Sequence, residues 1–579
     1  MCGIAGILGN ADLSVSGSMA TRLSHRGPDG LGGYEDVLAN GSICLSQSRL
    51  AIVDIDGSWQ PIKSEHGCVL VQNGEIYNHN KIKSQITNYS WQTSGDAETI
   101  LALHRKFAFN NMKPAEIPSG KKVGELFRTG DADKKENNAF RHKNWISKLD
   151  GIWGFAIWDP SSRELILCRD PMGVKPLFRT LLPDGTLLFS SEIKSFYAHP
   201  DFVSKPDINA LAVRLAYEYP LDQTTLFSGV TSVAQGTIET WSLDKDGKAV
   251  LTGICRYSKD EISPESFWDH RTGAKILLDS LQSSVDDRMM ADVPIGMVLS
   301  GGLDSSLLAV LAKQSADNSG GQPPECWTVA GQEDNPDMIA AINVAQNNEL
   351  KHHKLIIDKD KFWKTLPNFV WSGEDLDVSV LFWQPLFESM SKKVKVGICG
   401  QGADELHAGY SRYKNLPKHA ELIDQRLSLL GNFSIDESSV GVGQPWINTN
   451  FSAKHNFSNL GKSLQNHGRF TEAMAAYKSA MLLSPTKGEA ANNIATLHHQ
   501  AGETMLTSAT PESAWVRLHT AKHWYHIAKE ATPKSTAILT NLASAHLLLG
   551  EIDSSYQYFE ECLEINTHNA AVWNNYGQA

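Results

Sequence analysis

The sequence predicts a multidomain chain in which an α/β domain is followed by an all-α domain of helical repeats. An apolar strand at residues 293–299 leads through a glycine-rich turn into a helix at residues 307–312, which is the order of elements in a parallel α/β sheet. From residue 457 onward, small and aromatic residues recur at a 34-residue period typical of paired-helix repeats. With 579 residues, the chain has room for about three or four domains.

Composition and charge limit the classes of function. The formal net charge of −12 argues against broad binding to nucleic acid or to an anionic membrane. No segment approaches the roughly 18 consecutive apolar residues of a membrane span, and the N-terminus lacks a signal-peptide pattern. The eight cysteines have no spacing typical of a zinc knuckle or a redox pair. We therefore expect a cytoplasmic protein with reduced cysteines and without nucleic-acid or membrane partners.

The glycine-rich turn is Ser-Gly-Gly-Leu-Asp-Ser-Ser at residues 300–306. Such a turn exposes backbone N–H groups at the positive end of a helix dipole, where anions bind. The Asp304 carboxylate would repel a phosphate unless a divalent cation lay between them, which implies Mg²⁺. The turn resembles the pyrophosphate loop of ATP pyrophosphatases, which implies ATP as the ligand. The expected ATP-binding residues here are Ser300, Gly301, Gly302, Asp304, Ser305 and Ser306.

A second strong pattern is Met-Cys-Gly-Ile-Ala-Gly at the N-terminus. Removal of Met1, which is usual before a small residue, would leave Cys2 with a free α-amino group. That amine can act as general base for the thiol of the same residue, because its ordinary pKa is about 8. We therefore expect Cys2 to be a nucleophile that needs no separate histidine.

Further motifs follow Cys2 along the chain. They lie at residues 22–30, 48–54, 73–78, 94–99, 150–156 and 169–178. Together they resemble the class II glutamine amidotransferases, and we assign residues 2–206 to this domain. The resemblance implies an α+β four-layer sandwich of the N-terminal-nucleophile hydrolase class that hydrolyses glutamine. Residues 107–148 depart from the family as a polar, charged insertion, which we expect to be a solvated loop.

The same resemblance implies a role for each site residue. Asn73 and the N–H of Gly74 would stabilise the oxyanion and complete the catalytic set with Cys2. Arg49 would hold the α-carboxylate of glutamine, because its planar fork matches a carboxylate. Glu75 and Asp96 would bind the amino end of the substrate.

Residues 207–413 resemble the synthetase half of asparagine synthetases, which implies an ATP-pyrophosphatase-type, Rossmann-like α/β domain. Segments 327–329 and 394–399 are the expected neighbouring strands. Ligands of such sheets gather at the carboxyl ends of the strands. We therefore expect Val329 and Gly400 to contact ATP, and Asp304 and Asp404 to hold Mg²⁺.

The combination predicts a ligase that uses glutamine, ATP and aspartate. Cys2 would release ammonia, ATP would adenylate the aspartate side chain, and ammonia would convert the adenylate to asparagine. Two departures leave alternatives open. Gln401 stands where the family usually has glutamate, and a later Pro-Phe-Leu-Asp motif and lysine are absent after Tyr413, as in a truncated domain. The alternatives are a scaffold or regulator that retains only glutaminase activity, and an enzyme that acts on another carboxylate.

The last third of the chain has a different pattern. Residues 414–453 are predicted to be a loop-rich linker. Residues 454–579 resemble tetratricopeptide repeats, which implies an all-α solenoid with a protein or peptide partner. An apparent insertion of 14 residues separates two helices of the second repeat.

Overall fold

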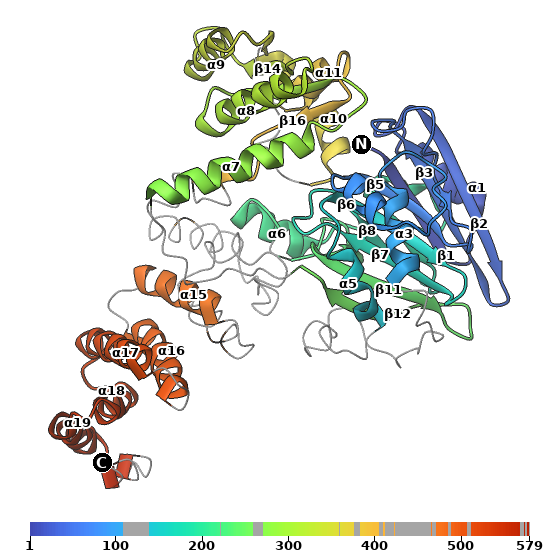
Figure 1. Cartoon of the computed structure of the whole chain (residues 1–579). Helices are drawn as coiled ribbons and strands as arrows, with labels where there is room; N and C mark the ends of the chain where they lie inside the picture. Colours follow the sequence, from blue (N-terminus) through green and yellow to red (C-terminus); the bar gives the residue numbers. More distant parts are fainter. Residues whose placement is uncertain are drawn as a thin grey trace. The chain divides into compact units, whose positions relative to one another are not determined.

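The computed structural model describes most of the chain (Figure 1). The described segments are residues 1–107, 138–220, 222–258, 270–357, 359–375, 383–404, 409–410, 470–483, 488–506 and 511–567, with isolated positions at 422, 462, 465, 572–573 and 576–577. They form two compact units, Met1–Ala403 and Asp404–Ala579. The predicted linker at residues 414–453 lies almost entirely outside the described residues. No helix of the described segments has the length and apolar character required to cross a bilayer.

The first unit begins with a six-stranded antiparallel sheet built around the N-terminal strand. Its order is β10 (Val230–Ser232), β8 (Phe178–Leu181), β9 (Leu187–Ser190), β1 (Gly3–Gly9), β3 (Gly41–Arg49) and β2 (Gly30–Leu38). All seven residues of β1 are buried, as expected for a central strand. By contrast, β2 alternates between half-buried and exposed residues, as expected at an edge.

A second six-stranded antiparallel sheet lies against the first. Its order is β12 (Ala249–Arg256), β11 (Thr237–Leu243), β7 (Glu164–Arg169), β6 (Gly151–Asp159), β5 (Val69–Ile76) and β4 (Ile62–Lys63). One apolar cluster joins the facing sides of the two sheets, because it contains Ile4 and Leu45 of the first sheet and Val71 and Leu167 of the second.

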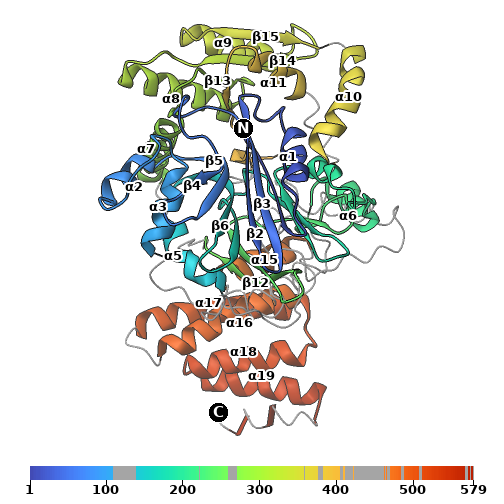
Figure 2. The ribbon, with the colours of Figure 1, turned by 90° about the vertical axis from the view of Figure 1, so that its right-hand side faces the viewer.

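Helices cover the outer sides of both sheets (Figure 2). On the first sheet, α1 (Leu13–Thr21) and the 3₁₀ helix η4 (Ile193–Ala198) pack against β1 and β9. On the second, apolar residues from three helices form a cluster with β5, β6 and β7. These helices are α2 (His79–Gln85), α3 (Glu98–Phe107) and α5 (Lys143–Ile146). The described elements therefore form four layers in the order helix, sheet, sheet, helix.

Two sequence-based expectations for this region are corrected. The predicted boundary at residue 206 is too early, because β10, β11 and β12 complete the two sheets as far as Arg256. The end of the expected solvated loop, from residue 138, instead forms η3 (Asn138–His142) and α5. Trp145 and Ile146 are fully buried there, because they pack into the apolar layer beneath the second sheet. Residues 108–137 of that loop lie outside the described segments.

The rest of the first unit contains a four-stranded parallel sheet. Its order is β15 (His352–Ile356), β14 (Glu325–Ala330), β13 (Ile295–Val298) and β16 (Val396–Ile398). Helices cover both faces, which confirms the predicted α/β class. One face packs on α7 (His270–Arg288), α8 (Leu303–Ser319) and α9 (Pro336–Asn347), and the other on α11 (Trp383–Ser391). Helices α6 (Ile208–Tyr217) and α10 (Lys359–Gly373) complete the unit.

The second unit is helical in its described segments. It contains α15 (Phe470–Leu483), α16 (Gly488–Leu506), α17 (Pro511–Ala531), α18 (Thr536–Leu548) and α19 (Ile552–Ile565). The small and aromatic positions of the predicted repeats are buried between paired helices, including Ala473, Tyr477, Ala495, Ala521 and Tyr525. The apparent insertion lengthens α16 and α17 to 19 and 21 residues.

Candidate active site

Cys2 lies immediately before β1, beside the end of β3. The antiparallel register pairs Gly3 with Ser48, which brings Cys2 next to Arg49 and Leu50. The N–H of Leu50 lies 3.3 Å from Cys2 Sγ, and the thiol in turn lies 3.6 Å from the Leu50 carbonyl oxygen. Burial raises the pKa of the Cys2 thiol above its ordinary value. A base is therefore needed to generate the thiolate.

One face of β5 presents to Cys2 the residues predicted to stabilise the oxyanion and to bind the substrate. Side chains alternate along a strand, so Val71, Asn73 and Glu75 share a face. Val71 packs in the cluster that contains Ile4 of β1, and the charge of Glu75 acts on the Cys2 thiol. The structure thus brings Asn73 and Glu75 to the side of β5 on which Cys2 lies.

Asn73 and Gly74 have the properties that an oxyanion-stabilising pair requires. The Asn73 side chain is fully buried, and neither its nitrogen nor its oxygen has a hydrogen-bond partner within the described part of the chain. Such a group normally finds a partner, which points to a ligand here. At Gly74, an added Cβ would lie 2.2 Å from the Ile152 carbonyl oxygen, so only glycine fits this close strand pairing.

The two predicted acids, Glu75 and Asp96, interact with each other. Asp96 is buried and accepts hydrogen bonds from the Ile76 N–H at 2.8 Å and from Gln72 Nε2 at 3.4 Å. Burial, and then the negative charge of Asp96, raise the pKa of Glu75 well above its ordinary value. A bound ammonium group would relieve this repulsion, which suits the amino end of an amino acid.

Arg49 is held by the loop that follows it. Its Nη2 donates to the carbonyl oxygens of Asp54 and Ile55 at 3.0 Å and of Gly57 at 2.5 Å. Its guanidinium lies over the ring of Trp59, 4.7 Å from the ring centroid. The side chain is therefore fixed at the end of β3, beside Cys2 in the sheet.

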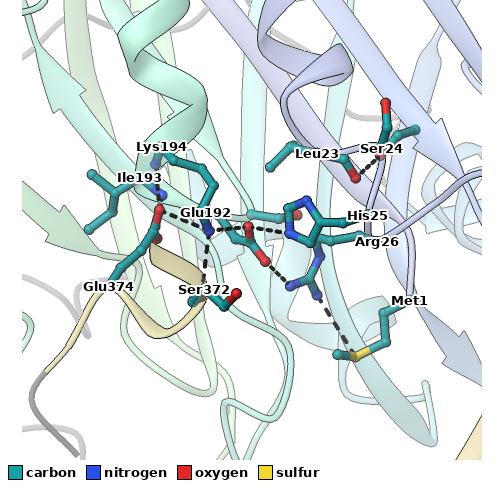
Figure 3. A network of polar contacts seen from close by, with 12 residues as sticks. Met1, Leu23, Ser24, His25, Arg26, Glu192, Ile193, Lys194, Ser372 and Glu374 are labelled. Atoms are coloured by element: carbon teal, nitrogen blue, oxygen red, sulfur yellow. Dashed lines mark hydrogen bonds and ion pairs between the residues drawn. The ribbon is translucent and has the colours of Figure 1, made fainter. Parts of the chain in front are cut away.

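Sequence reasoning missed a buried lysine and a salt-bridged network beside Cys2. Burial lowers the pKa of Lys175 to about 8, and the charges of Glu75 and Cys2 raise it in opposition. Arg26 donates from Nε to the carbonyl oxygen of Cys2 at 3.0 Å. Its Nη1 donates to Glu192 at 2.5 Å (Figure 3). The family-like motifs at 22–30 and 169–178 contained Arg26 and Lys175, but nothing local to either motif assigned them a role.

The predicted pyrophosphate loop lies between β13 and α8, at the carboxyl edge of the parallel sheet. Gly301 has φ +81°, and an added Cβ would lie 2.6 Å from the Ala341 N and the Asp337 O of α9, so the turn requires glycine. Ser305 Oγ accepts from the Ser300 N–H at 3.1 Å and braces the turn. Ser306 Oγ is buried without a hydrogen-bond partner in the described segments.

The turn after β16 meets this loop, as predicted. Ile398 of β16 pairs with Met297 of β13, so both strands end at the same edge. An added Cβ on Gly400 would lie 3.3 Å from Asp304 Cβ, which places Gly400 against the first turn of α8. Val329 lies in β14, the other neighbour of β13. Asp404 begins the second unit, so its expected role as a metal ligand stays a prediction.

The oxygen groups of this edge fit Mg²⁺ and phosphates. The Asp304 carboxylate and the free Ser306 hydroxyl are hard oxygen donors, and the first turn of α8 supplies N–H groups. Elsewhere in the described segments, Cys68, His104 and Asp159 place ligand atoms within 4.8 Å of one another. Among the residues that the structure describes, this buried group lacks the fourth protein ligand of a structural zinc site.

Comparison with known proteins matches both halves of the first unit. The glutamine amidotransferase domain model matches residues 1–114 and 140–250, and the asparagine synthase model matches residues 277–532. In these two matched domains the chain is similar to the glutamine-hydrolyzing asparagine synthetases. A tetratricopeptide repeat model matches residues 536–569. The asparagine synthase match extends across the predicted linker into the first described repeat helices, and the amidotransferase match passes residue 206, as the sheets do.

Individual members of the asparagine synthetase family show the same extent of likeness. The glutamine-hydrolyzing asparagine synthetases of Cricetulus griseus and Homo sapiens are each 29% identical over 453 residues, covering 74% of this chain and 70% of theirs. Among solved structures, the chain is similar to a glutamine phosphoribosylpyrophosphate amidotransferase from B. subtilis. The identity is 16%, the TM-score is 0.28, and 61% of this chain and 65% of that chain are covered.

Proposed function

We propose that this protein is a glutamine-dependent asparagine synthetase. The observation that carries the proposal is the buried amide of Asn73, which has no hydrogen-bond partner among the described residues and lies on the strand face that also presents Glu75 to Cys2. The family matches over both halves of Met1–Ala403 support it. We further assign the four-layer region to the N-terminal-nucleophile hydrolase class and the parallel sheet to the Rossmann-like ATP pyrophosphatases.

Glutamine cleavage begins at the mature N-terminus. After Met1 is removed, the amine of Cys2 takes the thiol proton and the sulfur attacks the carboxamide carbon. The oxyanion accepts hydrogen bonds from the Asn73 side chain and the Gly74 N–H. When the tetrahedral intermediate collapses, the Cys2 ammonium returns its proton to the leaving nitrogen and ammonia departs. Water then hydrolyses the thioester to glutamate. Arg49 binds the α-carboxylate of glutamine, while Glu75 and Asp96 bind its ammonium group.

Amide formation takes place at the edge of the parallel sheet. The 300–306 turn and Gly400 bind the phosphates of ATP, and the backbone at Val329 contacts adenine. Asp304 would hold Mg²⁺, which would neutralise phosphate charge there, and Asp404 stays a predicted second ligand. The aspartate side-chain carboxylate displaces pyrophosphate to form an acyl-adenylate. Ammonia then attacks the acyl carbon, and AMP leaves.

A product assay tests the synthetase half directly. The purified chain is incubated with ATP, Mg²⁺, aspartate and ammonium, and AMP, pyrophosphate and asparagine are measured. We expect the three products in equal amounts. Gln401, which is exposed after β16, replaces an acidic residue, so a Gln401→Glu variant should accelerate the reaction if a carboxylate assists proton removal. Glutamine hydrolysis without any pyrophosphate release would contradict the synthetase proposal.

The helical unit suits a different task. Tetratricopeptide arrays present surfaces that bind peptides, so we propose a protein or peptide partner for it and a cytoplasmic location for the enzyme. Pull-down with the full chain, compared with a variant in which exposed Trp515 and Val516 are changed to serine, tests the partner surface.

A further inference from the structure

A buried chain of charged side chains joins the N-terminal catalytic region to the segment after α10. It runs from Arg26 through Glu192 and Lys194 to Glu374 (Figure 3). All four residues belong to the compact unit Met1–Ala403. Two cations and two anions alternate along it, so the chain is balanced in charge, as buried ion pairs must be.

The Cys2 end of this chain is a backbone contact. Arg26 Nε donates to the carbonyl oxygen of Cys2 at 3.0 Å, and its Nη1 donates to Glu192 Oε1 at 2.5 Å. The guanidinium is planar and rigid, so a movement of Glu192 turns the same plane that holds Cys2. One guanidinium thereby joins the Glu192 carboxylate to the backbone of Cys2.

The other end reaches the ATP-binding half. Lys194 Nζ lies 2.5 Å from Glu192 Oε2 and 3.2 Å from Glu374 Oε1. Glu374 also accepts from the N–H groups of Ile193 at 2.7 Å and Lys194 at 2.5 Å, at the first turn of η4. Its side chain is only 8% exposed. Glu374 thus binds both the backbone N–H and the side-chain ammonium group of Lys194, the residue that pairs with Glu192.

Position along the chain ties Glu374 to the nucleotide edge. It directly follows α10, and the same stretch continues through α11 to β16 and to Gly400, which packs against Asp304. Glu374 therefore lies in the part of the sequence that leads to the nucleotide edge, with residues 376–382 outside the described segments.

We propose that Glu374 is a positioning residue for glutamine cleavage, acting through Lys194, Glu192 and Arg26 on the backbone of Cys2. This inference rests on the proposed role of Cys2 as nucleophile. Without Glu374, the Lys194 ammonium would keep Glu192 as its charged partner, beside the Ser372 carbonyl oxygen at 3.5 Å, and would draw that carboxylate away from Arg26. Misplacement of a reacting group by about 1 Å can cost up to about a hundredfold in rate. The ATP-binding half would in this way hold the glutaminase site in its cleaving geometry.

A neighbouring ion pair provides a matched control. Asp375 binds Arg214 of α6, at 2.7 Å from its Nε and 3.2 Å from its Nη2. This pair joins the same segment to the same domain, but it does not touch Glu192 or Arg26 in the contacts of the described residues. Loss of the Asp375 charge therefore weakens the attachment of the segment after α10 without disturbing the series of charged side chains that leads from Glu374 to Cys2.

The experiment compares Glu374→Gln with Asp375→Asn in the full chain. We expect Glu374→Gln to lower kcat for glutamine hydrolysis by about five- to a hundredfold with little change in KM. Pyrophosphate release with ammonium as nitrogen source should stay at the wild-type rate. Asp375→Asn should leave both reactions unchanged. Equal effects of the two variants on glutamine kcat would overturn the proposal and indicate a purely structural contact.

A double-mutant cycle gives a second, independent test. If Lys194 transmits the effect, then Lys194→Met combined with Glu374→Gln should lower kcat no further than the stronger single change. If the losses in kcat of the two single variants add in the double variant, the proposed coupling of Glu374 to Cys2 through Lys194 is overturned. Thermal unfolding of each variant identifies failure to fold. Arg26→Lys is a third variant. It keeps the positive charge but loses the planar guanidinium, so its kcat for glutamine hydrolysis should fall. Cys2→Ala separates failure of the Glu374 proposal from failure of the proposed function. Glutamine hydrolysis that survives this change would contradict the assignment of Cys2 as the nucleophile.

Discussion

The backbone N–H of Leu50 points at the sulfur of Cys2 from 3.3 Å. A donor so placed favours the thiolate over the thiol, and it counteracts the burial that raises the pKa of Cys2. The contact arises because β1 and β3 pair in a register that sets the first residues of the chain beside the end of β3.

Replacement of the sulfur should separate the two reactions. We expect Cys2→Ala to abolish glutamate release from glutamine, since no nucleophile remains, while ammonium-driven pyrophosphate release continues. Cys44→Ala, which removes a buried cysteine inside β3, is the matched control. Glutamate release by Cys2→Ala at the native rate would show that another group attacks the substrate.

The unpartnered amide of Asn73 should act on the transition state. Removal of one oxyanion donor typically costs about 10²–10³ in kcat, so we expect Asn73→Ala to lose this much with a small change in KM for glutamine. Asn40→Ala is the control, because Asn40 donates to the Asp244 carbonyl oxygen at 2.6 Å, in the turn between β2 and β3. A rise in KM at constant kcat would instead place Asn73 in ground-state binding.

Titration of Lys175 should make both stability and glutamine hydrolysis depend on pH in the mildly alkaline range. Burial lowers its pKa to about 8 from an ordinary 10.5, so between these values the unfolded chain binds more protons than the folded one. The free energy of unfolding should therefore rise with pH across this window. Over the same window, loss of the cation beside Cys2 and Glu75 should lower kcat/KM for glutamine.

Urea unfolding and initial rates from pH 7 to 10 check both trends. Both should disappear in Lys175→Met, because that side chain has similar length and no charge. A wild-type rate profile that is flat across this range would exclude a role for the Lys175 charge.

Asp304 should be needed for nucleotide chemistry but not for glutamine cleavage by itself. We expect Asp304→Asn to abolish pyrophosphate release with either nitrogen source, because Mg²⁺ loses a carboxylate ligand. Asp317→Asn, on the same helix, removes an exposed carboxylate that pairs with Lys313 at 2.9 Å and should have no effect. Pyrophosphate release that is unchanged in Asp304→Asn at limiting Mg²⁺ would remove Asp304 from the metal site.

The candidate site divides into residues that local motifs identify and residues that only long-range pairing brings together. Cys2, the Asn73–Glu75 segment and the 300–306 turn were predictable, because each is a short segment whose residue types carry the chemistry. Arg26 and Lys175 belong to motifs that were recognised, yet their partners lie far away along the chain. Glu374 had no local signal at all.

The sequence by itself determined the order of the functional segments, the parallel α/β sheet and the small-residue spacing of the repeat helices. Those features depend on local periodicity and on residue type. Tertiary structure alone decided that β10, β11 and β12 belong to the first two sheets, that residues 138–146 are buried, and that Glu374 reaches Lys194. Strand pairing and buried ion pairs join residues distant in sequence, and no local pattern encodes which partners meet.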